Sequence, residues 1–203
     1  MPEPTTEILL VSASEMEMLR EPIGKVDKLV TGVGMVASTH QLTKRLSSNK
    51  YDLVVDIGIA GAFNPQLSLG TVVQVIEDRL VEMGVEDNGA FIPADEMNLV
   101  PSNNVKFSTQ SRVKDLPAAK GITVNRVHGS AESIERVVKQ FNPDIESMEG
   151  AAVAYVCQQF GVPWVQIRAI SNRVEPRNRN AWNIPLAIEN LHNVVLNYLQ
   201  HEA

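Results

Sequence analysis

The chain has 203 residues, 44% of them hydrophobic, with a formal net charge of −6 and a single cysteine. This length fits one domain, which we predict to span residues 1–203, and a chain of this size buries about 70% of its unfolded surface. Cys157 has no partner for a disulfide, and the Cys and His residues lack the spacing of a zinc site. With 24 acidic residues against 18 Lys and Arg, the sequence also lacks the broad basic face that nucleic-acid binding requires. We expect no metal, no cofactor and no nucleic-acid partner.

The N-terminal segment is acidic, and its apolar run covers only residues 8–11. A signal peptide needs a basic start and roughly 7–15 apolar residues, while a membrane span needs about 20. We therefore expect a cytoplasmic protein that does not contact a membrane.

Short apolar runs alternate with helical patterns along the chain. Strands are expected at 8–11, 28–30, 53–57, 72–76, 122–127, 145–148 and 164–170, and helices at 15–20, 36–46, 132–140, 149–160 and 184–199. This alternation predicts a three-layer α/β/α sandwich with a central mixed sheet. In open α/β sheets the ligand binds beyond the carboxyl ends of the strands, so the residues that follow each apolar run are the candidates for a site.

A segment rich in serine and glutamate, residues 12–17, follows the first expected strand. At that position the carboxylate of Glu17 can be partly desolvated and act as a general base. The alternative is a solvated first turn of a helix, where the helix dipole favours glutamate.

A G-x-G-x-x-A string, within residues 31–37, lies between a strand and a helix, and Asp52 and Asp56 follow about 20 residues later. Glycines let the backbone approach a ligand and a helix N-terminus favours an anion, so the string is similar to a dinucleotide-binding turn. The alternative is an ordinary tight turn between a strand and a helix.

Small residues also fill the segment 56–63, which we expect to form a loop directly after the strand residues 53–55. Gly58 and Gly61 would let a flat ligand lie against the backbone of this loop. An ordered turn without a ligand explains the same residues.

Two glutamates, Glu146 and Glu149, flank Met148 at a strand end, and a later strand ends near Asn172. A carboxylate can accept hydrogen bonds from two vicinal hydroxyls, as ribose presents them, and an amide offers both donors and an acceptor to a heterocycle. Each residue alone can be a helix cap or a turn residue. Their combination is unusual.

Five segments, in this order and spacing, resemble the nucleoside phosphorylase/nucleosidase superfamily, and most closely its methylthioadenosine/S-adenosylhomocysteine nucleosidase branch. They are the acidic segment with Glu17, GVGMVA at 32–37, DIGIAGAF at 56–63 followed by LGTVV, SMEGAA at 147–152, and RAISN at 168–172. The resemblance covers nearly the whole chain. Within that branch, RAISN followed by VEPRN, and GVED at 84–87, are similar to futalosine hydrolases of the alternative menaquinone pathway.

The resemblance implies a nucleoside phosphorylase-like fold, a homodimer or larger homo-oligomer, and a cofactor-free enzyme that cleaves the N-glycosidic bond of a small-molecule nucleoside. The implied site residues are catalytic Glu17 and Asn172, and substrate-binding Gly61, Met148, Glu149 and Ser171. By this resemblance Glu17 activates water, and Glu149 binds the sugar hydroxyls beside Met148.

Three departures from the family pattern bear on the substrate. Asn172 stands where adenosine-specific members carry an aspartic acid, and an amide that donates to a 6-oxo group suits hypoxanthine. Asp56 stands where phosphorylases carry a phosphate-binding arginine, which favours water as the nucleophile. Ile59 replaces the serine that nucleosidases usually carry, so the hydrogen bonding on the sugar side differs.

Futalosine also carries a carboxyphenyl group, for which Arg173, Arg177 or Arg179 offers a bidentate partner, unless these arginines form an exposed basic loop. The leading hypothesis is futalosine hydrolysis with release of hypoxanthine. The alternatives are a methylthioadenosine/S-adenosylhomocysteine nucleosidase, an NAD-dependent oxidoreductase, and a nucleoside-binding module without activity.

Overall fold

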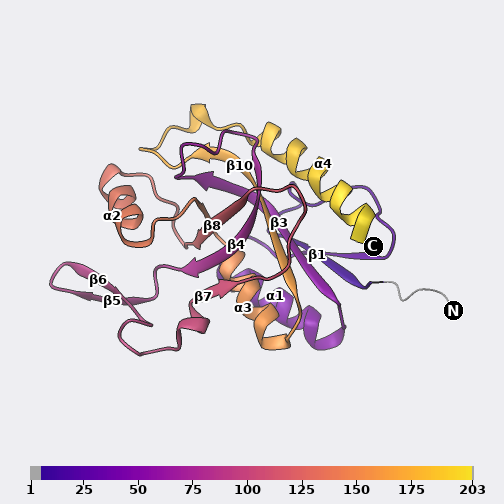
Figure 1. Cartoon of the computed structure of the whole chain (residues 1–203), viewed down its shortest axis with the longest axis horizontal. Helices are drawn as coiled ribbons and strands as arrows, with labels where there is room; N and C mark the ends of the chain where they lie inside the picture. Colours follow the sequence, from indigo (N-terminus) through magenta and orange to yellow (C-terminus); the bar gives the residue numbers. More distant parts are fainter. Residues whose placement is uncertain (1–5, 203) are drawn as a thin grey trace.

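The computed structural model describes residues 6–202 and shows a mixed sheet covered by helices on both faces (Figure 1). The strands are β1 Ile8–Ser12, β2 Val26–Val30, β3 Leu53–Ala62, β4 Val72–Leu80, β5 Gly84–Asp87, β6 Ala90–Pro93, β7 Lys106–Ser108, β8 Ala118–Thr123, β9 Ile145–Ser147 and β10 Trp164–Arg173. The helices are α1 Met35–Ser48, α2 Ala131–Phe141, α3 Gly150–Phe160 and α4 Ile184–Glu202. The first five residues and Ala203, which the predicted domain includes, lie outside the described residues.

The main sheet runs in the order β10-β4-β8-β9-β3-β1-β2, and β7 pairs with β4. A further parallel pairing joins β10 to β3, so that β10, β4, β8, β9 and β3 form a closed ring of paired strands. β5 and β6 form a separate hairpin that projects from the body of the molecule beside α2 (Figure 1).

Each face of the sheet has its own hydrophobic core because successive side chains of a strand point to opposite faces. On β1, Ile8 and Leu10 pack in the core beneath α4, whereas Leu9 and Val11 pack in the core shared with α1 and α3. The four innermost residues of α4 recur every four positions and are fully buried: Ala187, Leu191, Val195 and Leu199. Figure 1 shows α4 on one face and α1 with α3 on the other, which confirms the three-layer sandwich with a mixed sheet.

The predicted helix at 15–20 is wrong. The backbone N–H groups of Glu17 and Met18 both donate to the carbonyl of Ser14, which forms an isolated turn and no helix. A helix as short as one turn is not stable by itself, because nucleation costs more than its first hydrogen bond returns.

The predicted loop at 56–63 is also wrong, because β3 continues to Ala62. A Cβ atom on Gly61 would lie 2.9 Å from Val174 Cγ2 and 3.0 Å from Asn172 Nδ2. The glycine therefore allows close packing between neighbouring chain segments, and tertiary pairing overrides its weak strand preference.

The strand expected at 122–127 lies earlier, at Ala118–Thr123, and the structure adds the strands β5, β6 and β7. The hairpin strand β5 is exposed at every position, so its sequence carries no alternation of buried and exposed residues to predict it. Within residues 6–202, no helix has the length and apolar character needed to cross a membrane.

Candidate active site

The predicted site residues meet near the carboxyl end of β3. Gly61 of β3 pairs with Glu146 of β9 on one side and with Asn172 of β10 on the other. Glu17 reaches the same strand from the turn after β1. The strand pairing therefore brings together segments that are far apart in the sequence.

Glu17 is 8% exposed, and both of its carboxylate oxygens accept hydrogen bonds. The Ser14 hydroxyl donates to Oε2 at 2.7 Å, and the backbone N–H of Ile59 donates to Oε1 at 3.1 Å. A Cβ atom on Gly58 would lie 3.0 Å from Glu17 Oε1, so the glycine leaves room for this carboxylate. The two hydrogen bonds hold the Glu17 carboxylate in a fixed position near the carboxyl end of β3, as a general base requires.

Glu149 is the residue that precedes α3, and its side chain does not cap that helix. Its Oε1 instead accepts a hydrogen bond of 2.8 Å from the backbone N–H of Gly34. Burial raises the pKa of the Glu149 carboxyl, while the Gly34 hydrogen bond and the charge of Arg168 act in the opposite direction. The G-x-G-x-x-A turn thus contacts the predicted ribose-binding carboxylate, and Met148 is half-buried next to it.

The missing cap of α3 is supplied by a different strand. The backbone N–H of Ala151 donates to Thr123 Oγ1 at 2.8 Å, and the Thr123 hydroxyl donates to Asp78 Oδ1 at 2.9 Å. Gln166 Nε2 donates to the other oxygen of Asp78 at 2.9 Å. Because Thr123, which Asp78 holds in place, accepts a hydrogen bond from the start of α3, the Glu149 side chain is free to face the site.

A buried ion pair lies near Glu17 and Glu149. Arg168 Nη2 lies 2.5 Å from Asp56 Oδ2, and both side chains are almost completely buried. Burial raises the pKa of Asp56 to about 6, against the pull of the Arg168 charge. The sequence signal that could have revealed the structural role of Arg168 is its position as a lone cation inside the apolar run of β10. Asp56 neutralises this cation, so an incoming anion meets a guanidinium that is already paired.

Asn172 lies at a β-bulge, where Ser171 is the extra residue between the paired positions Ile170 and Asn172. The Ser171 hydroxyl donates to Asn172 Oδ1 at 2.9 Å, and Asn172 Nδ2 donates to the carbonyl of Arg173 at 3.0 Å. One amide hydrogen of Asn172 remains for a ligand. Ser171 is thus placed to orient the Asn172 amide.

A small cavity of about 40 Å³ adjoins this amide, and its lining includes an interacting pair of side chains that is not among the predicted site residues. They are His128 and Glu146, whose Nδ1 and Oε2 atoms lie 2.6 Å apart. A larger cavity of about 750 Å³ lies between the β5–β6 hairpin and α2, and His128 and Arg177 line both.

The three predicted carboxylate-binding arginines have different surroundings. The Arg173 guanidinium donates to the carbonyls of Asn64 and Pro65, which fixes it to the loop after β3. Arg177 lies over the ring of Trp182, 5.6 Å from its centroid, and borders both cavities. Arg179 is exposed in a 3-10 turn and lines neither of these two cavities.

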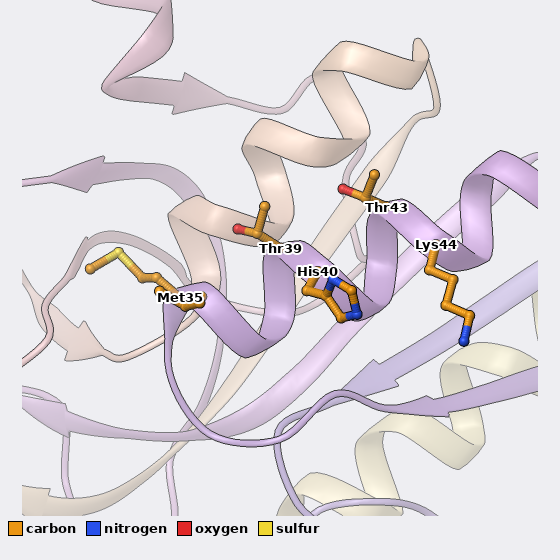
Figure 2. A pocket seen from close by; sticks show the side chains of 6 residues that line it. Met35, Thr39, His40, Thr43 and Lys44 are labelled. Carbon is orange, nitrogen blue, oxygen red and sulfur yellow. The ribbon is translucent and has the colours of Figure 1, made fainter.

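A separate hollow follows the outer face of α1 and contains none of the predicted site residues (Figure 2). Its lining comes from a single helix: Met35, Val36, Thr39, His40, Thr43 and Lys44.

Beside the site, Val33 and Val36 are 63% and 84% exposed. In the described part of the chain, no group of three or more His, Cys, Asp or Glu side chains is arranged to hold a metal ion.

Comparison with known sequences identifies the family to which the chain belongs. The sequence profile of the phosphorylase superfamily matches residues 24–200. The chain is 32% identical to the futalosine hydrolase of Streptomyces coelicolor, over 96% of this chain and 85% of that protein. It is 28% identical to the 5'-methylthioadenosine/S-adenosylhomocysteine nucleosidase of Haemophilus ducreyi, over 87% of this chain and 80% of that protein.

Solved structures share the fold. A 5'-methylthioadenosine/S-adenosylhomocysteine nucleosidase from Colwellia psychrerythraea, in complex with adenine, superposes with a TM-score of 0.79 at 20% identity, covering 98% of this chain and 96% of that one. The futalosine hydrolase of Helicobacter pylori superposes with a TM-score of 0.78 at 19% identity, covering 98% and 99%. These likenesses confirm a nucleoside phosphorylase-like architecture.

Proposed function

Because the chain belongs to the phosphorylase superfamily, we propose that it hydrolyses the N-glycosidic bond of futalosine and releases hypoxanthine and dehypoxanthine futalosine. Its curated relatives include three futalosine hydrolases at 28% to 32% identity as well as nucleosidases for methylthioadenosine and S-adenosylhomocysteine. Cleavage of a purine nucleoside is common to both groups, and the choice of base separates them.

The proposed reaction begins with Glu17, which takes a proton from water as the water oxygen bonds to the anomeric carbon of the sugar. The bond between that carbon and the purine breaks, and its electron pair leaves with the base, which gains a proton. The sugar passes through a state with positive charge, which the nearby carboxylates of Glu17 and Glu149 stabilise. Glu149 also accepts hydrogen bonds from the ribose hydroxyls, held in place by Gly34.

The hydrogen bonding of the Asn172 amide is the observation that favours hypoxanthine over adenine as the released base. The remaining hydrogen of this amide, in the cavity that includes Gly61, suits the 6-oxo group of hypoxanthine. A site built to hydrogen-bond one purine edge leaves polar groups unpaired against the other edge, which costs about 1–3 kcal/mol per group.

Water as the nucleophile is supported by the Asp56–Arg168 pair. A phosphorylase needs a cation that is free to bind phosphate, whereas Asp56 already neutralises the buried Arg168. Arg177, which borders both cavities, is the proposed partner of the substrate carboxylate.

The alternative function is a methylthioadenosine/S-adenosylhomocysteine nucleosidase. It is favoured by a relative of that kind from Anoxybacillus flavithermus, which is 33% identical over 71% of this chain. Under this alternative the enzyme releases adenine.

Chromatography of the free base tests both functions. Futalosine, inosine and methylthioadenosine are each incubated with the enzyme, with and without phosphate. We expect hypoxanthine from futalosine at a rate that phosphate does not change. Adenine from methylthioadenosine as the main product would establish the alternative, and a requirement for phosphate would contradict hydrolysis.

The exposed apolar residues Val33 and Val36, next to the Gly34–Glu149 contact, support a homo-oligomer in which another copy covers this edge of the site. Light scattering coupled to size-exclusion chromatography measures the mass of the particle. Val36→Asp should lower that mass to one chain, whereas an unchanged mass would exclude this surface as the interface.

A further inference from the structure

His128 and Glu146 form a dyad beside Asn172, in the lining of the same small cavity. Glu146 lies in β9 opposite Gly61, and its side chain is 3% exposed. The ring Nδ1 of His128 lies 2.6 Å from Glu146 Oε2, and the backbone N–H of His128 donates to Oε1 at 3.1 Å. The Phe63 and His128 rings pack in a T-shaped arrangement, with ring centroids 6.0 Å apart. The ring is therefore held between a sheet residue and an aromatic wall.

The hydrogen bond to Glu146 determines which ring nitrogen carries the hydrogen. An ionised carboxylate only accepts hydrogen bonds, so Nδ1 is the donor. In the neutral ring Nε2 then has a free lone pair and is an acceptor. No other described residue forms a hydrogen bond with Nε2, and the ring borders both cavities.

The His128 ring and the Asn172 amide line the same small cavity, and Gly61 also lines it. A Cβ atom on Gly61 would lie 3.0 Å from Asn172 Nδ2 and 3.5 Å from Glu146 Cγ, so the amide and the dyad flank the same glycine. The pair offers one donor, from Asn172, and one acceptor, from His128.

We propose that His128 Nε2, oriented by Glu146, accepts the N1–H hydrogen of a 6-oxopurine while Asn172 donates to its oxygen. A 6-oxopurine presents an acceptor beside a donor on this edge, and a 6-aminopurine presents the reverse order. His128 thereby determines the specificity for the base, and Glu146 is the residue that positions it. The inference rests on the proposed function for the base that is released.

A purely structural dyad, which only ties residues 125–130 to β9, predicts something different. Its loss would weaken the binding of both bases by the same factor. The ratio of the affinities for hypoxanthine and adenine therefore separates recognition from structural support.

The first experiment is isothermal titration calorimetry with free hypoxanthine and free adenine. In Glu146→Gln the new amide donates to Nδ1, so the ring hydrogen moves to Nε2 and the acceptor is lost. We expect hypoxanthine to bind about 10- to 100-fold more weakly and adenine to bind at least as well as before. His128→Ala should weaken hypoxanthine about 10-fold and leave adenine unchanged. His40→Ala, on the exposed face of α1, is the matched control (Figure 2).

The second experiment needs no substitution. Nitrogen-15 NMR of the histidine rings, recorded at a pH where the His128 ring is neutral, should show Nδ1 protonated and Nε2 unprotonated in the free protein, with a shift of the Nε2 signal when hypoxanthine is added. A hypoxanthine to adenine ratio that stays within about 2-fold in both variants, or a proton on Nε2 in the free protein, would overturn the inference. Hypoxanthine binding that depends on His128 without any release of base from nucleosides would instead overturn the proposed function and leave this inference intact.

Discussion

Gly34 and Glu149 are 115 residues apart in the sequence and are joined by a 2.8 Å hydrogen bond from the Gly34 backbone N–H to Glu149 Oε1. Gly34 has a φ of 95°, a conformation that glycine adopts without strain, and it is the N-cap residue that precedes α1. The contact fixes one oxygen of the carboxylate with a backbone group that cannot rotate away. In the described residues the other oxygen has no hydrogen-bond partner, so it can accept a hydrogen bond from a ligand.

Glu17→Gln should lower the rate of base release by about 10²–10⁴-fold while ligand affinity is kept, because an amide cannot take a proton from water. Single-turnover release of the base, together with calorimetric binding, measures the two effects. Glu15→Gln, on the exposed side of the same turn, is the matched control. A rate within a few-fold of the wild type would show that another group is the base.

Asn172→Asp should shift specificity toward 6-aminopurines, because a carboxylate accepts from an amino group and has no hydrogen to offer an oxo group. We expect the ratio of kcat/KM for methylthioadenosine to that for futalosine to rise about 10- to 10³-fold. The comparison uses both substrates on both proteins. An unchanged ratio would mean that Asn172 does not contact the base.

Arg168→Met should lower the free energy of unfolding by about 3–5 kcal/mol, because it leaves the buried Asp56 without its partner. The double variant Asp56→Asn, Arg168→Met should recover most of this loss. Urea denaturation gives both values. Arg136→Met, which breaks an exposed pair with Glu132, serves as the control and should cost about 0.5 kcal/mol or less.

Gly150→Ala should destabilise the protein by about 1–3 kcal/mol, because its Cβ would lie 2.1 Å from Gln166 Nε2 and 2.3 Å from Asp78 Oδ2. Thermal unfolding measures the change. At Gly129 the nearest atom to such a Cβ is 3.7 Å away, so Gly129→Ala should be tolerated. Equal effects at the two positions would argue against the close packing beneath α3.

Asp78→Asn should change how stability depends on pH. Burial raises the pKa of Asp78 to about 6 from an ordinary value of 3.8, so the folded protein holds this proton at pH values where the unfolded chain has lost it. The wild type therefore loses stability as the pH rises from about 4 to about 6. An asparagine does not ionise, and Gln166, whose Oε1 has no hydrogen-bond partner, can rotate to accept from it.

The stability of Asp78→Asn relative to the wild type should thus increase by an amount on the order of 2 kcal/mol between pH 4 and pH 7. Denaturation curves recorded across this range measure the difference. A difference that does not vary with pH would show that Asp78 does not titrate in this window.

The sequence predicts the elements whose apolar pattern is unbroken, such as β1, α3 and α4, because burial alone determines their faces. It also places Glu149 at the start of a helix and Asn172 near the end of a strand, as in the structure, whereas Glu17 lies in an isolated turn and not in the predicted helix. It does not predict contacts between distant segments: the Gly34–Glu149 hydrogen bond and the His128–Glu146 dyad depend on the strand order, which local periodicity does not contain. The pairing of Arg168 is equally hidden, because the residue that compensates its charge lies on another strand.

The β-bulge at Ser171 divides β10 into two parts that can change separately. Before it, Arg168 pairs in register with Gly58, and after it, Asn172 pairs with Gly61. The extra residue absorbs the offset between these two registers. The backbone around Asn172 can therefore adjust while the strand before the bulge keeps its alignment with β3. Under the proposed function, the bulge therefore marks the position at which an engineered enzyme for another purine can be sought.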